Sequence, residues 1–256
     1  MIQKDDGVVL KTARSGETSR IVTFLGKRSG KVRIIAKGAL KPTSPFRGAL
    51  EPGNHAEVLY YYKEGRTLYF LREVHVHSSI DAGRGSLART AASLAVLELA
   101  DAVCFWESPE ARVVDLVVEY LRCPPAEDPV LLFLAFETAL LEALGALPDL
   151  SSCAVCGEPF ERGFYHPEEG ESACPLHTRP SAHRLELDAD LAALERALAG
   201  SPLASAARAS VPGGVRKRLG ALLHWTYTFH VQNYRLPESL KLIQKDQGDR
   251  DGGTER

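Results

Sequence analysis

The chain has 256 residues, of which 45% are hydrophobic and 25% are charged. These proportions are ordinary for a globular protein and exclude a largely disordered chain, a collagen-like repeat and a disulfide-dense miniprotein. The formal net charge is −2, but residues 1–77 carry 14 Lys and Arg against 7 Asp and Glu, so the remainder is net negative. A basic segment on an acidic body is typical of nucleic-acid binders, although a solvated surface without a partner explains the charge equally well.

The first 77 residues predict a small β domain. Five short segments are rich in β-branched or aromatic residues: Val8–Leu10, Ile21–Leu25, Val32–Ala36, Val58–Tyr62 and Thr67–Leu71. Turn-forming Gly, Pro and Ser residues separate them, and no helical pattern intervenes. This count and length favour a five-stranded Greek-key barrel of the OB type, and an SH3-like barrel fits the pattern nearly as well.

Helical spacing of apolar residues dominates the rest of the chain. A linker is expected over Asp81–Ser86, with Ser86 as the N-cap of a helix that starts at Leu87. Further helices are predicted over Pro109–Leu121, Asp128–Leu144, from Asp188 to Gly200, and Val215–Asn233. We therefore expect an α+β protein with an OB-type barrel over 1–80, an α-helical bundle domain over 81–149 and 184–243, an inserted small zinc-knuckle module over 150–183, and a disordered tail over 244–256.

Residues 150–183 contain a metal-binding pattern. Cys153 and Cys156 form a C-x-x-C, and Cys174 and His177 form a C-x-x-H after seventeen intervening residues. Two such pairs have the spacing of a structural zinc site, because three thiolates and one imidazole fill a tetrahedron and leave no open position. The alternatives are His166 or His183 as fourth ligand, or an emptied knuckle that folds without Zn²⁺.

The cysteine count and the N-terminus predict a reducing compartment. Five cysteines are an odd number, no apolar segment follows the charged N-terminus, and no uncharged apolar run is long enough to span a membrane. We expect a cytoplasmic protein whose cysteines serve metal binding or packing and do not form disulfides.

An enzyme is one alternative interpretation. His55-Ala56-Glu57 followed by a C-x-x-C resembles the H-x-E and P-C-x-x-C pattern of zinc nucleobase deaminases. Against it, His55 and Glu57 fall in the strand-rich segment, Ser152 precedes the first cysteine where that pattern has proline, and the four residues above already complete a metal shell. A zinc-stabilised scaffold that binds only proteins is a third interpretation.

Basic and aromatic residues interleave in the predicted barrel. Basic grooves attract phosphates, and aromatic faces stack bases with little regard to sequence. Alternation along Tyr60-Tyr61-Tyr62 puts the middle ring on the opposite face from its neighbours, so at least one ring is expected outside the barrel. The candidate phosphate-binding residues are Lys11, Arg14, Arg20, Lys31, Arg33, Lys37 and Arg47.

Several stretches resemble a known family. Asp6–Lys11 with Gly16–Val22, and Gly30–Ala39 continuing through Phe46–Gly48 to Leu50–Pro52, are similar to the opening of the bacterial RecO family of recombination mediators. The metal motif after a helical stretch and Glu238–Lys241 after the last helix match that family's layout. Leu40 and Pro45 stand where basic residues are usual in the family, and His177 stands where a fourth cysteine is more usual.

The resemblance implies a non-enzymatic DNA repair protein with an N-terminal OB-fold, associated with the nucleoid. It would bind single- and double-stranded DNA, anneal complementary strands, and help load RecA onto strands coated with single-stranded-DNA-binding protein. Its partners would be RecR, in some cases RecF, and the acidic C-terminal tail of single-stranded-DNA-binding protein. No Walker-type phosphate loop occurs in the sequence. Arg216, Lys217 and Arg218 open the last predicted helix and are candidates for binding that tail; a solvated basic turn is the alternative.

Overall fold

The computed structural model describes residues 1–79, 87–126, 128–232 and 234–242, which form two compact units. Unit 1 comprises Met1–Arg122 and the segment from Pro237, and unit 2 comprises Cys123–Leu236. The expected linker over 81–86 and the expected tail over 244–256 lie outside the described residues, and the domain boundaries given above stay a prediction. Within the described part of the chain, no helix is long and apolar enough to cross a membrane.

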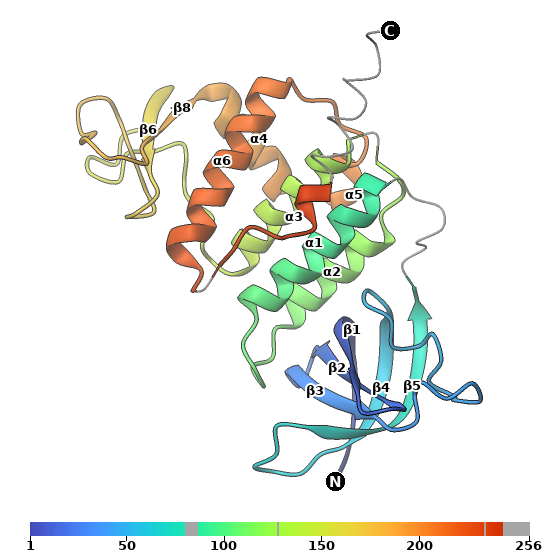
Figure 1. Ribbon diagram of the computed structural model, residues 1–256. Helices are drawn as coiled ribbons and strands as arrows, with labels where there is room; N and C mark the ends of the chain where they lie inside the picture. The colour runs from blue at the N-terminus through green and yellow to red at the C-terminus, as the bar shows by residue number, and fades with distance from the viewer. Residues whose placement is uncertain (80–86, 127, 233, 243–256) are drawn as a thin grey trace, which may run out of the picture. The chain divides into compact units, whose positions relative to one another are not determined.

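Five strands of unit 1 close into a barrel in the order β1-β2-β3-β5-β4, which confirms the predicted architecture (Figure 1). The strands are β1 Ile2–Ser15, β2 Ser19–Gly26, β3 Gly30–Ala36, β4 His55–Tyr61 and β5 Tyr69–Ser78. β1 is much longer than predicted because its first half pairs with β4 and its second half pairs with β2. An irregularity between Val9 and Lys11 marks where β1 bends from one partner to the other.

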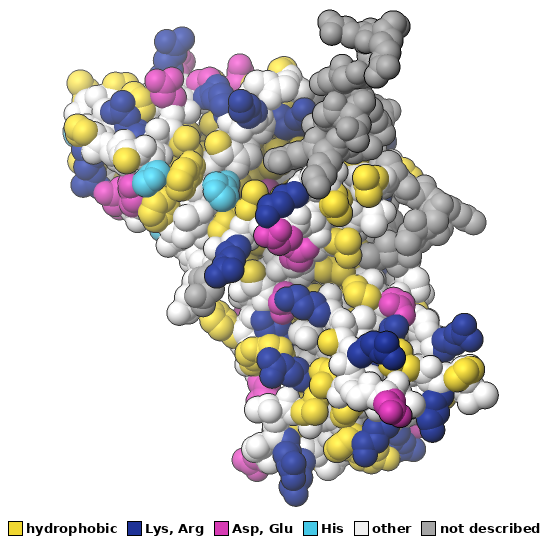
Figure 2. Space-filling model, in the orientation of Figure 1, with side chains coloured by type: hydrophobic (Ala, Val, Ile, Leu, Met, Phe, Trp, Pro, Cys, Tyr) yellow, Lys and Arg dark blue, Asp and Glu magenta, His cyan; other side chains and the backbone are white. Residues whose placement is uncertain are grey.

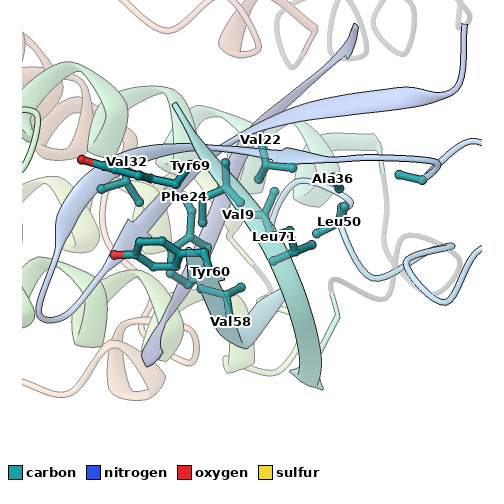
Figure 3. Close-up of a cluster of buried hydrophobic side chains, with 12 residues drawn as sticks. Val9, Val22, Phe24, Val32, Ala36, Leu50, Val58, Tyr60, Tyr69 and Leu71 are labelled. Carbon is teal, nitrogen blue, oxygen red and sulfur yellow. The ribbon is translucent and has the colours of Figure 1, made fainter. Parts of the chain in front are cut away.

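Alternating side chains fill the barrel interior (Figure 3). Phe24, Val32 and Tyr60 point inward and are at most 3% exposed. Tyr61 points outward and is 49% exposed, as the alternation predicts. Such period-two patterning fixes the register, because a one-residue slip would turn every core side chain to the outside.

Helices α1 Leu87–Val103 and α2 Ala111–Arg122 pack against β1, and α2 also contacts β2. The segment between the two helices completes the barrel wall. Trp106 forms a parallel bridge with Lys31, and the Glu107 N–H donates to the Lys31 carbonyl at 3.0 Å. Gly30 has φ +66°, and a Cβ there would lie 2.1 Å from the Ser108 carbonyl oxygen, so only glycine allows this approach.

Unit 2 is built on α3. Its elements are α3 Pro129–Ala143, β6 Arg162–His166, β7 Glu171–Ala173, β8 Leu185–Asp188, α4 Ala189–Ala199, α5 Leu203–Ala206 and α6 Gly213–His230. Helices α4, α5 and α6 contact α3, and the three strands form a small sheet in the order β7-β6-β8. The helices predicted from spacing are confirmed with small shifts of their ends, whereas α5 and β8 were not predicted.

Two acidic side chains of unit 2, Glu137 and Glu195, are buried. Glu137 of α3 is 5% exposed, and it forms no ion pair with any residue that the structure describes. The Tyr227 hydroxyl donates to its backbone carbonyl at 2.8 Å. Burial raises the pKa of the Glu137 carboxyl to about 8, because the charged form loses its hydration.

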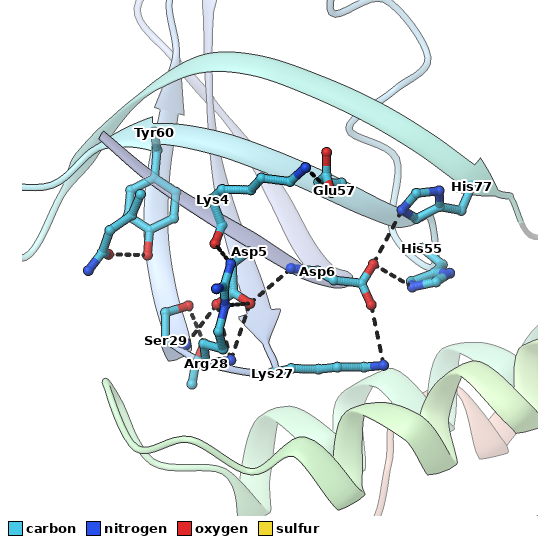
Figure 4. A network of polar contacts seen from close by, with 12 residues as sticks. Lys4, Asp5, Asp6, Lys27, Arg28, Ser29, His55, Glu57, Tyr60 and His77 are labelled. Carbon is cyan, nitrogen blue, oxygen red and sulfur yellow. Dashed lines mark hydrogen bonds and ion pairs between the residues drawn. The ribbon is translucent and has the colours of Figure 1, made fainter. Parts of the chain in front are cut away.

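Asp5 anchors the turn between β2 and β3 (Figure 4). Its carboxylate is 2% exposed and accepts the backbone N–H groups of Asp6 at 2.9 Å, Arg28 at 3.2 Å and Ser29 at 2.7 Å. The Arg28 guanidinium donates to the Lys4 carbonyl alongside. A single buried carboxylate therefore satisfies one main-chain donor of β1 and two of the β2–β3 turn.

Asp5→Ala is expected to destabilise unit 1 by about 3 kcal/mol, because it removes the charged acceptor of three part-buried N–H donors. Asp5→Asn keeps one acceptor oxygen and should lose less. Urea unfolding followed by Trp106 fluorescence, in a Trp225→Phe background, measures the change. Glu64→Ala in the exposed β4–β5 turn is the control, and an equal loss in that variant would contradict the role of Asp5.

Candidate nucleic-acid surface and candidate metal centre

Four of the candidate basic residues are exposed on the barrel without an ion pair to another described residue: Arg14, Arg33, Lys37 and Arg47. The Arg33 guanidinium carbon lies 4.6 Å from the centre of the Trp106 ring, and the Lys37 Nζ lies 4.7 Å from the centre of the Phe70 ring. Cations held beside exposed aromatic rings offer a phosphate contact and a stacking face at one place.

Further basic side chains line a hollow beside the end of β3. It is lined by Arg20, Lys41, Arg47, Phe46 and Glu51, together with small and apolar residues of the same loop. Arg20 forms an ion pair with Glu51 at 2.6 Å. Arg14 lies directly opposite Arg20 in the β1–β2 register, a like-charged pair that a bound anion would relieve.

Figure 2 shows Lys and Arg side chains at many places over the face of the barrel that it views, with hydrophobic side chains between them. Four aromatic side chains among the described residues of unit 1 are notably exposed: Tyr61 at 49%, Phe70 at 45%, Phe105 at 64% and Trp106 at 46%. The register places Phe70 beside both Ile35 and Tyr61, so the barrel exterior carries an apolar row next to the cations.

Phe105 and Trp106 are surface residues that the sequence analysis missed. They lie between α1 and α2. The one indication in the sequence was two adjacent aromatic residues that do not fit the apolar spacing of either helix. Glu107 follows with φ +56°, an unusual value for a residue other than glycine. Its side chain accepts from the Tyr69 hydroxyl at 2.6 Å. Glu107 thus fixes the segment that carries Phe105 and Trp106 to the barrel.

Besides Arg20, two more of the predicted phosphate-binding residues form ion pairs. Lys31 is only 7% exposed, and its Nζ donates to the Asp101 carbonyl at 2.6 Å and lies 3.3 Å from the Asp101 carboxylate. Lys11 is more exposed but pairs with the same carboxylate at 2.5 Å. Lys31 stays a prediction as a phosphate-binding residue, but α1 covers this side of the barrel and brings Asp101 onto a lysine that strand alternation places outside.

The basic cluster on the last helix is also mostly engaged. Arg218 pairs with Asp188 at 2.5 Å, and Arg216 pairs with Asp128. Asp188 and Asp128 are the N-cap residues of α4 and α3, so both arginines tie α6 to the start of another helix. Lys217 alone of the three falls in the exposed class. Arg216 and Arg218 therefore tie α6 to two helix caps of unit 2, and the assignment of the cluster as a partner-binding patch stays a prediction.

The structure brings the four predicted metal ligands together. The ligand atoms of Cys153, Cys156, Cys174 and His177 all lie within 4.8 Å of one another. His177 Nδ1 is 3.2 Å from the Cys174 sulfur and 3.7 Å from the Cys153 sulfur. Three thiols and an imidazole nitrogen at such separations fit a closed tetrahedral site for a thiophilic divalent ion.

Two tight turns and a hairpin build this centre. The Gly157 N–H donates to the Cys153 carbonyl at 2.8 Å, and the His177 and Thr178 N–H groups donate to the Cys174 carbonyl at 3.0 Å. The β6–β7 hairpin brings the two turns to the same place. Hydrogen bonds from the backbone N–H groups of Cys174 and Cys156 lower the pKa of the Cys153 thiol to about 6, which favours the thiolate that binds metals.

The competing ligands have other partners. His166 Nε2 lies 3.2 Å from the Thr178 hydroxyl, and His183 Nδ1 lies 2.7 Å from Glu168. His55 and Glu57, the pair that suggested a deaminase, lie in β4 and not at the start of a helix. The cluster of three cysteines and His177 is complete without any of these residues.

Comparison with known proteins covers nearly the whole chain. The family model described as "Recombination protein O N terminal" matches residues 1–80, and "Recombination protein O C terminal" matches residues 84–240. Similar proteins named DNA repair protein RecO occur in Streptomyces coelicolor, 33% identical over 94% of this chain and 98% of the relative, and in Anaeromyxobacter sp. strain K, 34% identical over 84% and 87%. A third, from Exiguobacterium sibiricum, is 32% identical over 75% of this chain and 77% of its own length.

Proposed function

The chain belongs to the RecO family of DNA repair proteins, and from that premise we propose that it anneals complementary DNA strands and helps load RecA onto single strands coated with single-stranded-DNA-binding protein. The observation that carries the proposal is the set of exposed, unpaired cations on the barrel beside exposed aromatic rings. Binding and positioning suffice for this activity, so no catalytic residue is assigned.

The mechanism is electrostatic. Two complementary strands repel each other through their phosphates, and a surface that neutralises both lets the first base pairs form. Arg14, Arg33, Lys37 and Arg47 would bind phosphates, with Arg20 and Lys41 at the hollow beside them. Trp106 and Phe70, each already next to a cation, would stack on unpaired bases and hold a strand in an extended form.

The metal centre would hold Zn²⁺ in a structural role. Cys153, Cys156, Cys174 and His177 provide four ligands and leave no position for water or substrate. Zn²⁺ would fix the two turns against the β6–β7 hairpin. The bound ion would stabilise unit 2 and would take no part in contacts with DNA.

Protein partners are expected from the family. We propose RecR, in some cases RecF, and the acidic tail of single-stranded-DNA-binding protein as partners of the chain at the cytoplasmic nucleoid. Lys217 is the one member of the Arg216–Arg218 cluster that stays exposed and unpaired among the described residues, so it is the first residue to test for the tail.

Reversal of Arg33, Lys37 and Arg47 to Glu is expected to slow annealing and to flatten the salt dependence of single-strand binding. Each neutralised phosphate contributes about −0.7 to the slope of log K against log salt, so the slope should become shallower by about 2. The measurement is the affinity for a labelled single strand at several salt concentrations, with annealing of protein-coated complementary strands measured in parallel without ATP.

A variant with Arg196, Arg208 and Arg235 reversed to Glu is the matched control. It makes the same change in net charge with exposed cations of unit 2. Its slope should equal that of the wild type. If the control flattens the slope and the barrel variant does not, the DNA surface lies in unit 2. If the wild-type chain neither binds bare strands at low salt nor anneals them, the proposed function is wrong.

A further inference from the structure

A second cluster of metal-ligating side chains lies on the barrel, apart from the cysteine centre. Asp6 of β1, His55 of β4 and His77 of β5 place their ligand atoms within 4.8 Å of one another (Figure 4). His55 Nε2 is 2.9 Å and His77 Nε2 is 3.3 Å from the same oxygen, Asp6 Oδ1. Ligands about 2.0–2.1 Å from a tetrahedral Zn²⁺ are about 3.3 Å apart, so these separations nearly match the edges of one coordination shell.

The buried histidine nitrogen forms no well-aligned hydrogen bond within the described residues, although it is in ion-pair range of Asp6. His55 is 8% exposed, and its Nε2 lacks a hydrogen-bond partner among the described residues, although Asp6 Oδ1 is close. The oxygen is near the nitrogen but out of line for a hydrogen bond. A buried ring nitrogen without an acceptor in line carries a free-energy cost, which a bound cation would remove.

The strand pairing aims His77 at this point. In the β4–β5 ladder Ala56 pairs with Val76 and His55 pairs with Ser78, so His77 is an extra residue opposite no partner. Such a bulge turns one side chain away from its regular alternation, and bulges are frequent next to binding sites. His75, two residues earlier, pairs with Glu57 and lies outside the cluster.

We propose that Asp6, His55 and His77 form a Zn²⁺ site with water as the remaining ligand. Asp6 and His77 have side chains that are each 34% exposed, so the site is open to solvent on one side. Two imidazoles and one carboxylate are a donor set that Zn²⁺ accepts readily. A bound ion would tie three neighbouring strands of the barrel together.

The neighbouring cations limit the affinity without blocking the site. Lys27 Nζ contacts the other Asp6 oxygen, Oδ2, at 3.3 Å and lies closer to Asp115 at 2.7 Å, so it can remain when Oδ1 binds the ion. Arg122 lies 3.0 Å from His55 Nδ1. Because a guanidinium only donates, Nδ1 accepts, and the proton of the neutral ring is on Nε2.

Zn²⁺ binding therefore moves that proton. The Nε2 lone pair binds the ion, the proton passes to Nδ1, and the hydrogen bond from Arg122 is lost; the imidazole stays neutral. Arg122 is exposed and can turn to solvent. Removal of Arg122 should thus strengthen Zn²⁺ binding, an effect opposite to that expected of a residue that merely supports the fold.

The test is a calorimetric titration of the full chain with Zn²⁺ after the cysteine centre has been loaded. The wild type should bind one further equivalent, and His77→Ala should weaken it at least about tenfold. His75→Ala should leave the affinity within about twofold, whereas Arg122→Ala should tighten it several-fold. Circular dichroism checks that each variant is folded, and added Zn²⁺ should raise the melting temperature of the wild type but not of His77→Ala.

The proposal is wrong if no further equivalent binds, if His75→Ala weakens binding as much as His77→Ala, or if Arg122→Ala weakens it. None of these outcomes depends on DNA binding, so the result is independent of the proposed function.

Discussion

Cys174→Ser is expected to leave the chain with one fewer tightly bound Zn²⁺ and with an unfolded 150–183 segment. Apparent binding energies of structural Zn²⁺ in small modules are about 10–16 kcal/mol, which is more than the short β6, β7 and β8 strands can replace by packing. Metal content after gel filtration measures the first effect. Limited trypsin digestion measures the second, because Arg162, Arg179 and Arg184 lie in or beside these strands.

His183→Asn is the control for this prediction. His183 was a competing fourth ligand, but its Nδ1 contacts Glu168 and it lies outside the cluster. That variant should keep its Zn²⁺ and its resistance to trypsin, whereas His177→Asn should lose affinity. Retention of the full metal content in Cys174→Ser would show that the cysteine cluster is an emptied knuckle.

Glu137→Gln is expected to stabilise unit 2 at neutral and alkaline pH. The carboxyl has a pKa of about 8 in the folded chain against an ordinary value of 4.5, so folding retains a proton that the unfolded chain releases. The contribution of Glu137 to stability is therefore greatest below pH 4.5, falls as the pH rises, and reaches its minimum above pH 8. The total loss is up to about 5 kcal/mol, of which about 3 kcal/mol is already lost at pH 7.

Glutamine has the shape of the protonated acid and removes this pH dependence. Urea unfolding between pH 5 and pH 8.5, followed by Trp225 fluorescence in a Trp106→Phe background, should show the variant gaining stability over the wild type as the pH rises. Glu195 of α4, whose pKa burial raises to about 7, contributes equally to both proteins. Glu142→Gln, an exposed position on α3, is the control; an equal gain there would refute the explanation by burial.

Local pattern was sufficient for most of the fold. Alternation located the strands, and apolar spacing located the long helices. The metal centre also followed from local spacing, because each C-x-x turn determines its own geometry and only one hairpin is needed to join the two. The length of β1 was not predictable in this way, since its first residues are strand because of the pairing with β4, far along the chain.

The charged side chains show where local pattern fails. Lys31 and Arg33 are two residues apart on one strand and look alike in the sequence, yet Asp101 of α1 neutralises one and leaves the other free. Arg216 and Arg218 pair with helix caps 88 and 30 residues away. Whether a surface cation is free to bind a ligand depends on such distant ion-pair partners, and composition alone cannot identify these partners.

The bridge between Lys31 and Trp106 determines when the barrel can be completed during translation. Within β3, only Ile34 and Ile35 pair with β5, so the first half of β3 has no partner there. The segment after α1 pairs with this half instead. A nascent chain that has emerged only to the end of β5 thus exposes a strand edge and the apolar residues Val8, Leu10 and Leu25, which α1 and α2 later cover. On the ribosome the barrel reaches its final form only once both helices have emerged.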